Sequence, residues 1–139
     1  MNAKEELNQY KFIKGRVQEA LEEYERFKER AEKMTTIISD NPSHTNKTSD
    51  KVGDNASAMA DLNREYKDRW LIAERKRLEL VDSINKVQEP YRTILMGRYI
   101  QDKNFEQIAC EMIYSYDRTI HLHGEALKIY EMLAYNSKT

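Results

Sequence analysis

The chain has 139 residues, of which 34% are charged, and it contains four Gly, two Pro and one Cys. A net charge of −1 excludes a strongly basic protein, and a single Cys excludes an intramolecular disulfide framework and fits a reducing compartment. The N-terminus lacks an apolar signal sequence and no run approaches ~18 apolar residues, so we expect a cytoplasmic protein without membrane contact.

A first long helix is predicted over residues 1–38. Apolar residues recur there in steps of three and four, so they share one stripe of a helix, and Glu, Lys and Arg fill its other faces. A stripe so narrow and so long is typical of a seam between two helices. The seam positions of this helix are Leu7, Tyr10, Val17, Leu21 and Tyr24.

Residues 39–55, SDNPSHTNKTSDKVGDN, predict a polar flexible loop because they hold Pro, Gly and many Ser, Thr, Asn and Asp. A second long helix is predicted over residues 56–88, with a second, shorter apolar stripe beside the main one. The main stripe contains Leu62, Tyr66, Trp70, Ala73 and Leu80. The two helices predict an antiparallel hairpin, which either stands alone or pairs with another copy as a homodimer or higher homo-oligomer.

Residues 89–139 predict three short helices. Pro90 is suited to open the first of them, over residues 91–99. Asn104 with Gln107 forms a capping-box pattern before a helix over 105–112, and Ser115 is the N-cap of a helix over 116–135. The breaks are only a few residues long, which is typical of a helix-turn-helix. The predicted fold is all-α: a long antiparallel, coiled-coil-like hairpin followed by a small C-terminal helix-turn-helix domain.

The segment ILMGRYIQDKNFEQIACEMIYSYDRTIHLHGEAL resembles the last DNA-binding region (region 4) of sigma factors. It is similar, more closely, to the ArpU/RinA-like regulators of late packaging and lysis genes in phages of Gram-positive bacteria. The similarity lies in Arg98-Tyr99-Ile100, in the turn from Ile108 to Ser115 and in the tail from His123 to Leu127, and it covers roughly residues 84–127. Two positions depart from the pattern: Ile113 stands where many such turns have Gly, and Thr119 where sigma-like domains usually have Val.

A helix-turn-helix of this kind places the start of its last helix against base edges. The candidate reading residues are Ser115, Tyr116, Asp117, Arg118, His121 and Leu122. Arg118 is the first candidate because Arg bonds a guanine edge bidentately. Candidates for contact with the DNA backbone are Arg92, Arg98, Lys103 and Gln107. Arg98 could equally be a structural partner within the domain, and Asp117 with Arg118 could be an ordinary solvated helix start.

The resemblance implies a sequence-specific DNA-binding regulator in a bacterial host cell, with double-stranded DNA as a partner and RNA polymerase as a further candidate partner. Two alternatives stay open: a small terminase-like DNA-packaging protein, and a helical module that binds another protein. Residues 90–139 hold six Lys or Arg and six Asp or Glu, so binding per copy is expected to be weak. We expect that the protein is not an enzyme and that it binds no cofactor or metal, because the sequence contains no phosphate-binding loop and no metal-ligand spacing.

Overall fold

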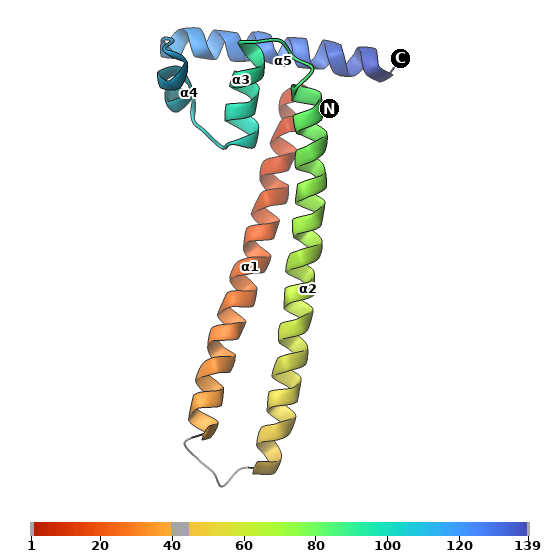
Figure 1. Ribbon diagram of the computed structural model, residues 1–139, viewed down its shortest axis with the longest axis vertical. Coiled ribbons are helices and arrows are strands. Elements are labelled where there is room, and N and C mark those ends of the chain that lie inside the picture. Colours follow the sequence, from red (N-terminus) through yellow and green to blue (C-terminus); the bar gives the residue numbers. More distant parts are fainter. Residues whose placement is uncertain (1, 40–44, 139) are drawn as a thin grey trace. The chain divides into compact units, whose positions relative to one another are not determined.

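The computed structural model describes the backbone of residues 2–39 and 45–138, and the side chains of residues 2–34 and 53–137. All of its regular elements within these ranges are helices, so the predicted all-α class is confirmed. They are α1 (Ala3–Ser39), α2 (Thr45–Ile84), α3 (Tyr91–Leu95), the π-helix η1 (Met96–Ile100), α4 (Phe105–Met112) and α5 (Tyr116–Lys138). Figure 1 shows α1 and α2 as the two arms of a hairpin, which was predicted.

The second arm begins earlier than its sequence pattern indicated. We predicted a loop over 39–55, but α2 is already helical from Thr45, and residues 40–44 of that loop lie outside the described residues. Ser, Thr, Asn and Asp each cost a helix at most about 0.7 kcal/mol relative to Ala, whereas Pro costs about 3. A polar run without Pro can therefore continue a helix that its neighbours already support.

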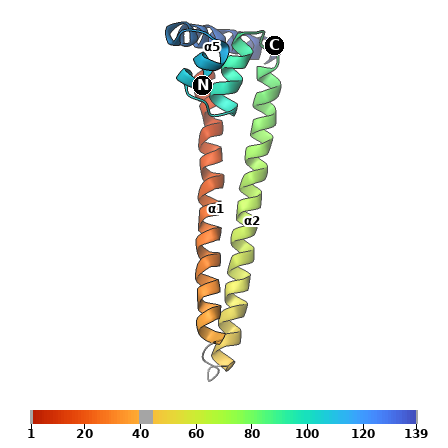
Figure 2. The same ribbon diagram turned by 60° about the vertical axis from the view of Figure 1, so that its left-hand side comes forward.

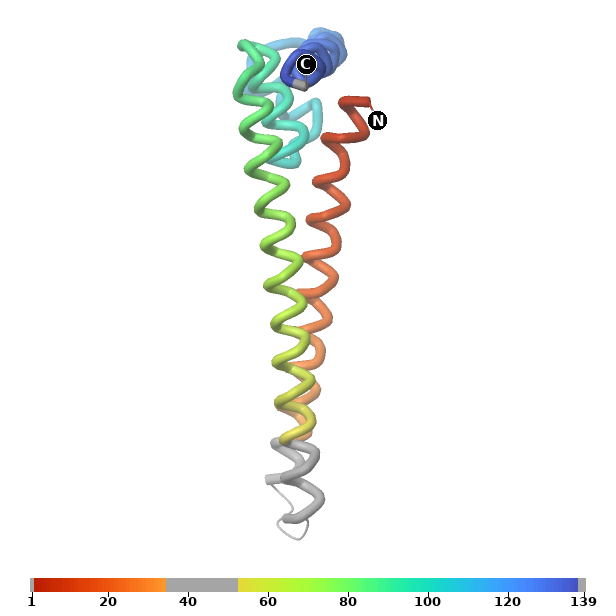
Figure 3. Tube along the Cα trace, turned by 90° about the vertical axis from the view of Figure 1, so that its right-hand side faces the viewer, coloured from red at the N-terminus to blue at the C-terminus, as the bar shows by residue number. Residues whose placement is uncertain are grey.

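The chain divides into two compact units, one formed by residues 14–72 and the other by 1–13 with 73–139. In the first unit, α1 and α2 run side by side in all three views (Figures 1, 2 and 3). Most predicted seam residues there are half-buried, namely Val17, Leu21, Tyr24, Leu62 and Tyr66. Trp70 is the exception at 46% exposed, because a helix with a single partner cannot cover both edges of a large indole.

The second unit has a core to which both ends of the hairpin contribute. The predicted seam residues Leu7, Tyr10 and Leu80 are buried here, and Ala73 is buried as well. The core cluster consists of Ala3, Leu7, Tyr10, Leu80, Ile84, Val87, Leu95, Tyr99, Ala126 and Tyr130. The backbone N–H of Ala3 also donates a hydrogen bond of 2.8 Å to Glu131 Oε1 in α5. The compact C-terminal unit therefore extends beyond residues 89–139 and includes the first turns of α1.

A smaller core holds the three C-terminal helices against one another. Ile94 of α3, Ile108 of α4 and Leu122 of α5 are buried together, with Phe105 and Met112 packed against them. Gly97 allows this close approach, because a Cβ at that position would lie 3.2 Å from Cγ1 of Ile108. A larger residue at position 97 would require the Ile108 side chain to move by a few tenths of an ångström.

Asn104 caps the start of α4, while Ser115 and a left-handed residue, Ile113, set the turn between α4 and α5. Asn104 and Gln107 form the predicted capping box, with the Asn104 side chain accepting from the Gln107 N–H at 2.8 Å. Ser115 Oγ accepts from the Arg118 N–H at 3.1 Å, as expected of the N-cap of α5. Between them Ile113 ends α4 at φ 59° and ψ 43°, with its side chain 92% exposed. A β-branched residue is rarely found in this region, because its Cβ crowds the following carbonyl.

We expect Ile113→Gly to raise the free energy of unfolding by about 0.5–1 kcal/mol. The left-handed conformation costs a residue with a Cβ roughly 1–2 kcal/mol, and the greater freedom of Gly in the unfolded chain offsets part of that gain. Urea unfolding followed by far-ultraviolet circular dichroism measures the difference. Ile113→Ala is the matched control, since it removes the same exposed methyl groups and keeps the Cβ. Equal stabilities of the two variants would show that backbone strain is not the cause.

Candidate nucleic-acid interface

Helix α5 has a buried side and an exposed side. Some of the predicted reading residues lie on the exposed side, and others are buried. Thr119, Leu122, His123 and Ala126 are buried, and Leu122 packs in the smaller core, which leaves it little surface for the predicted contact with a base. Leu122 is buried because it follows the buried Thr119 by three residues, and residues three apart share one side of a helix. Thr119 fills its Val-like position and donates its hydroxyl to the Ser115 carbonyl at 3.0 Å.

Arg118 is the exposed cation at the start of α5. Its guanidinium carbon lies 4.4 Å from the centroid of the Tyr114 ring, in the turn that precedes the helix. A cation–π contact at an exposed site is worth about 0.5–1 kcal/mol, enough to orient the side chain without neutralising its charge. Ser115, by capping the helix through the Arg118 backbone, fixes the start of the same segment. Arg118 is thus held at the surface with its donors available.

His121 and Asp117 are also exposed, and each has an intramolecular role. His121 Nε2 lies 3.1 Å from Glu125 Oε1, one turn further along α5. The other carboxylate oxygen of Glu125 accepts a hydrogen bond of 3.0 Å from the Tyr91 hydroxyl, and this bond raises the pKa of Tyr91. Asp117 occupies the first turn of α5, where a negative charge complements the helix dipole.

The residues predicted to contact the DNA backbone are engaged within the protein. Arg92 Nε donates to Asn85 Oδ1 at 2.9 Å, and Lys103 Nζ lies 2.7 Å from Glu111 Oε2. The Gln107 side chain completes the capping box by accepting from the Asn104 N–H at 3.0 Å. These contacts give Arg92 and Lys103 structural roles that the sequence did not indicate, and they confirm the predicted capping role of Gln107.

Arg98 lies against a cluster of three aromatic rings, those of Phe105, His123 and Tyr99. The Arg98 guanidinium carbon lies 4.6 Å from the Phe105 ring centroid, and the centroids of the Phe105 and His123 rings lie 4.8 Å apart with their planes at 63°. The Tyr99 hydroxyl and His123 Nε2 are hydrogen-bonded at 2.7 Å. Burial, and then the positive charges of Arg98 and Lys4, lower the pKa of His123 to about 4, so its ring is neutral at pH 7.

Two exposed apolar residues near the reading residues were not among the predicted site. Ile120 lies in α5, yet it is 38% exposed, and Ile113 in the turn is almost fully exposed. Tyr116, which was predicted, is 51% exposed. The sequence held no clear signal for this exposure, because Ile120 precedes the buried His123 by three residues, the spacing at which two side chains share one side of a helix.

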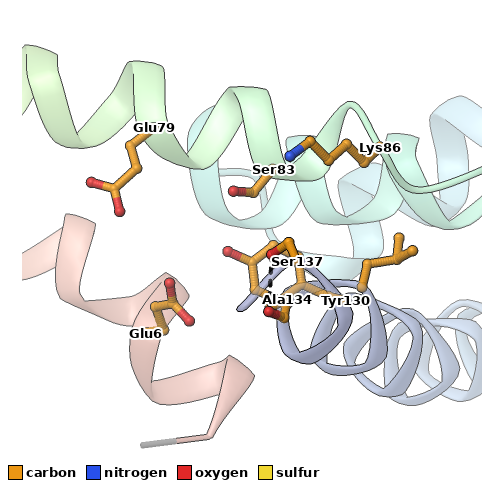
Figure 4. Close-up of a pocket in the computed structure, with 8 residues that line it drawn as sticks. Glu6, Glu79, Ser83, Lys86, Tyr130, Ala134 and Ser137 are labelled. Carbon is orange, nitrogen blue, oxygen red and sulfur yellow. Dashed lines mark hydrogen bonds between the residues drawn. The ribbon is translucent and has the colours of Figure 1, made fainter. Parts of the chain in front are cut away.

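A cleft of about 150 Å³ lies elsewhere in the same unit (Figure 4). Glu6 comes from α1 and Glu79 from α2, while Tyr130 comes from α5. Burial raises the pKa of Tyr130, and the negative charge of Glu6 raises it further. The cleft is lined by Glu6, Glu79, Ser83, Lys86, Tyr130, Leu133, Ala134 and Ser137. Because these residues come from three distant segments, no local sequence motif indicates the cleft.

The described residues bear on two further features, a membrane-spanning helix and a metal site. Its helices include none that is both long enough and apolar enough to cross a membrane. Among residues with described positions, no three His, Cys, Asp or Glu side chains gather as metal ligands.

Comparison with known proteins adds no relative to this description. No family model matches the chain. No curated protein and no solved structure matches it either. The function of the interface is therefore argued from its residues and geometry.

Proposed function

We propose that the chain is a sequence-specific DNA-binding transcription regulator that reads double-stranded DNA with the exposed side of α5. The observation that supports this most is the exposure and orientation of Arg118 at the start of α5. The Tyr114 ring orients the Arg118 side chain, and the three-residue turn that ends with the Ser115 cap places it directly after the turn. The first turns of the second helix of a helix-turn-helix enter the major groove, where Arg is the commonest reader of guanine. The similarity of residues 84–127 to late-gene regulators supports the proposal that the chain is encoded by a phage.

The charge distribution supports weak binding by each copy. Lys and Arg balance Asp and Glu in residues 90–139, and Lys103 and Arg92 each contact a carboxylate. Since phosphate neutralisation supplies much of the affinity for DNA, a single copy should bind weakly, and with few phosphate contacts its affinity should depend only modestly on salt. We therefore propose a homo-oligomer joined through the long helices, because two weak heads on one paired site bind far more tightly than either alone.

Arg118→Ala tests this proposal. Fluorescence anisotropy with labelled duplexes from the neighbourhood of the gene, at low and moderate salt, should show specific binding by the wild type. Loss of a bidentate guanine contact should weaken that binding roughly 5- to 150-fold. Lys128→Ala is the matched control, because Lys128 is also an exposed cation of α5 but lies three turns from its start.

The outcomes separate the proposal from its strongest competitor. A specific complex weakened by Arg118→Ala and retained by Lys128→Ala supports DNA reading by the start of α5. Folded wild-type protein that binds no duplex at low salt would contradict the proposal. It would favour instead a module that binds another protein, in agreement with the neutral charge of residues 90–139.

A further inference from the structure

A series of three polar side chains runs from α3 to the surface of α5 and ends at an exposed imidazole. The Tyr91 hydroxyl donates a hydrogen bond of 3.0 Å to Glu125 Oε2, and His121 Nε2 lies 3.1 Å from Glu125 Oε1. Tyr91 belongs to α3, whereas His121 and Glu125 lie one turn apart in α5. Because α3 anchors one oxygen of the carboxylate, the other oxygen holds the His121 ring in a defined orientation.

The carboxylate also decides which ring nitrogen of His121 carries the proton. An ionised carboxylate only accepts hydrogen bonds, so Nε2 must be the donor to Glu125 Oε1. In the neutral form of the ring, the single N–H is then at Nε2 and Nδ1 keeps its lone pair. The His121 side chain is 75% exposed, so the remainder of the ring is open to a ligand. Tyr91 and Glu125 thus make His121 a hydrogen-bond acceptor at the surface.

His121 shares a side of α5 with Arg118. The two residues are three apart, a spacing at which the side chains of a helix are neighbours. Both lie in the first two turns of α5, the part of such a helix that reaches base edges. We propose that His121 Nδ1 accepts a hydrogen bond from the exocyclic amino group of an adenine or cytosine beside the guanine that Arg118 contacts. This inference rests on the proposed DNA-binding function.

The pattern of groups in the major groove makes such an acceptor selective. The donors there are N6 of adenine and N4 of cytosine, whereas guanine and thymine present acceptors. Each base pair carries one of these donors, so an acceptor at a fixed place selects the strand on which adenine or cytosine lies. A ring free to turn would offer either nitrogen and would lose this selection. The contact with Glu125 therefore gives His121 a preference that an unrestrained imidazole would lack.

Removal of the amino group from single bases tests the inference. Duplexes of roughly three helical turns are selected on the full chain from a randomised pool at pH 8, where imidazoles are largely neutral. In the most enriched duplex, each adenine is replaced in turn by purine and each cytosine by 2-pyrimidinone, which lack only that amino group. At the contacted base, replacement should weaken binding by the wild type roughly 2- to 12-fold more than binding by His121→Ala, the effect of one hydrogen bond. The comparison cancels the cost of the weaker base pair, which both proteins share.

Two further variants test how the ring is positioned. Glu125→Ala removes the carboxylate and Tyr91→Phe removes the hydroxyl that anchors it, so both should reduce the penalty for the missing amino group. A merely structural effect would weaken binding to every duplex alike and leave that penalty unchanged. Tyr135→Phe is the matched control, because it removes the hydroxyl of a 72% exposed tyrosine about four turns beyond His121 and should keep the full penalty.

Each outcome decides between the inference and its alternatives. A penalty that is lost in His121→Ala and reduced in Glu125→Ala supports the proposed contact. Penalties equal in the wild type and His121→Ala at every adenine and cytosine would overturn it and leave DNA binding intact. A penalty that depends on His121 but survives both Glu125→Ala and Tyr91→Phe would overturn the positioning role of the carboxylate. Failure to enrich any duplex would overturn the proposed function itself.

Discussion

Leu7→Ala should lower the free energy of unfolding of the C-terminal unit by about 2–5 kcal/mol, although Leu7 lies far in the sequence from residues 73–139 of that unit. Leu7 is 1% exposed and packs in the core with Leu80, Leu95 and Ala126. Truncation to Ala removes buried apolar contacts and leaves a cavity that its helical neighbours fill only in part. Urea unfolding monitored by circular dichroism gives the magnitude.

Phe12→Ala is the control for the effect of Leu7→Ala. Phe12 has a larger side chain in the same helix and is 72% exposed, so its removal should change the free energy of unfolding by less than about 0.5 kcal/mol. Equal effects of the two substitutions would contradict the packing of α1 against the C-terminal helices. Because α5 carries both the buried Ala126 and the exposed Arg118, loss of Leu7 should also weaken the proposed DNA binding.

A second large effect is expected from acid. We expect the fold to lose up to about 3 kcal/mol of stability between pH 6.5 and 4 through His123 alone. Burial and the charges of Arg98 and Lys4 hold the pKa of His123 at about 4 in the folded chain, against an ordinary value of 6.5. Its neutral ring bonds the Tyr99 hydroxyl and packs on Phe105.

The direction of the pH effect follows from which state binds the proton. Above pH 6.5 the imidazole is neutral in both states and adds no pH dependence. As the pH falls below 6.5, the unfolded chain binds a proton that the folded chain excludes, so unfolding becomes more favourable. The loss is complete near pH 4, where His123 titrates in the folded state as well.

His123→Gln isolates this contribution from that of the carboxyl groups. Gln cannot titrate, so its unfolding free energy should fall less between pH 7 and 4.5 than that of the wild type, whatever its stability at pH 7. His121→Gln, which removes an exposed imidazole from the same helix, is the control for the substitution itself. A parallel decline for His123→Gln and the wild type would refute the assignment to His123.

Local sequence patterns were sufficient to predict the helices and their caps. The capping box of Asn104 with Gln107 and the cap at Ser115 depend on hydrogen bonds within four residues, so composition and spacing alone indicate them. The apolar stripes likewise predicted the hairpin, because a 3.6-residue repeat is visible in any one helix. The second helix was predicted to start at residue 56, but α2 starts at Thr45. Weak helix propensity is a poor guide to such a boundary because the tertiary context overrides it.

The tertiary structure alone decided which side chains remain available at the candidate interface. Leu122 is buried and Ile120 exposed because of the side on which α3 and α4 pack against α5, a fact set by contacts between segments distant in the sequence. Arg98 lies over Phe105 and Lys103 pairs with Glu111 for the same reason. The sequence by itself determined the fold class, the hairpin and the turn that presents Arg118. It could not determine which cations the fold engages, because that depends on three-dimensional neighbours that local spacing does not encode.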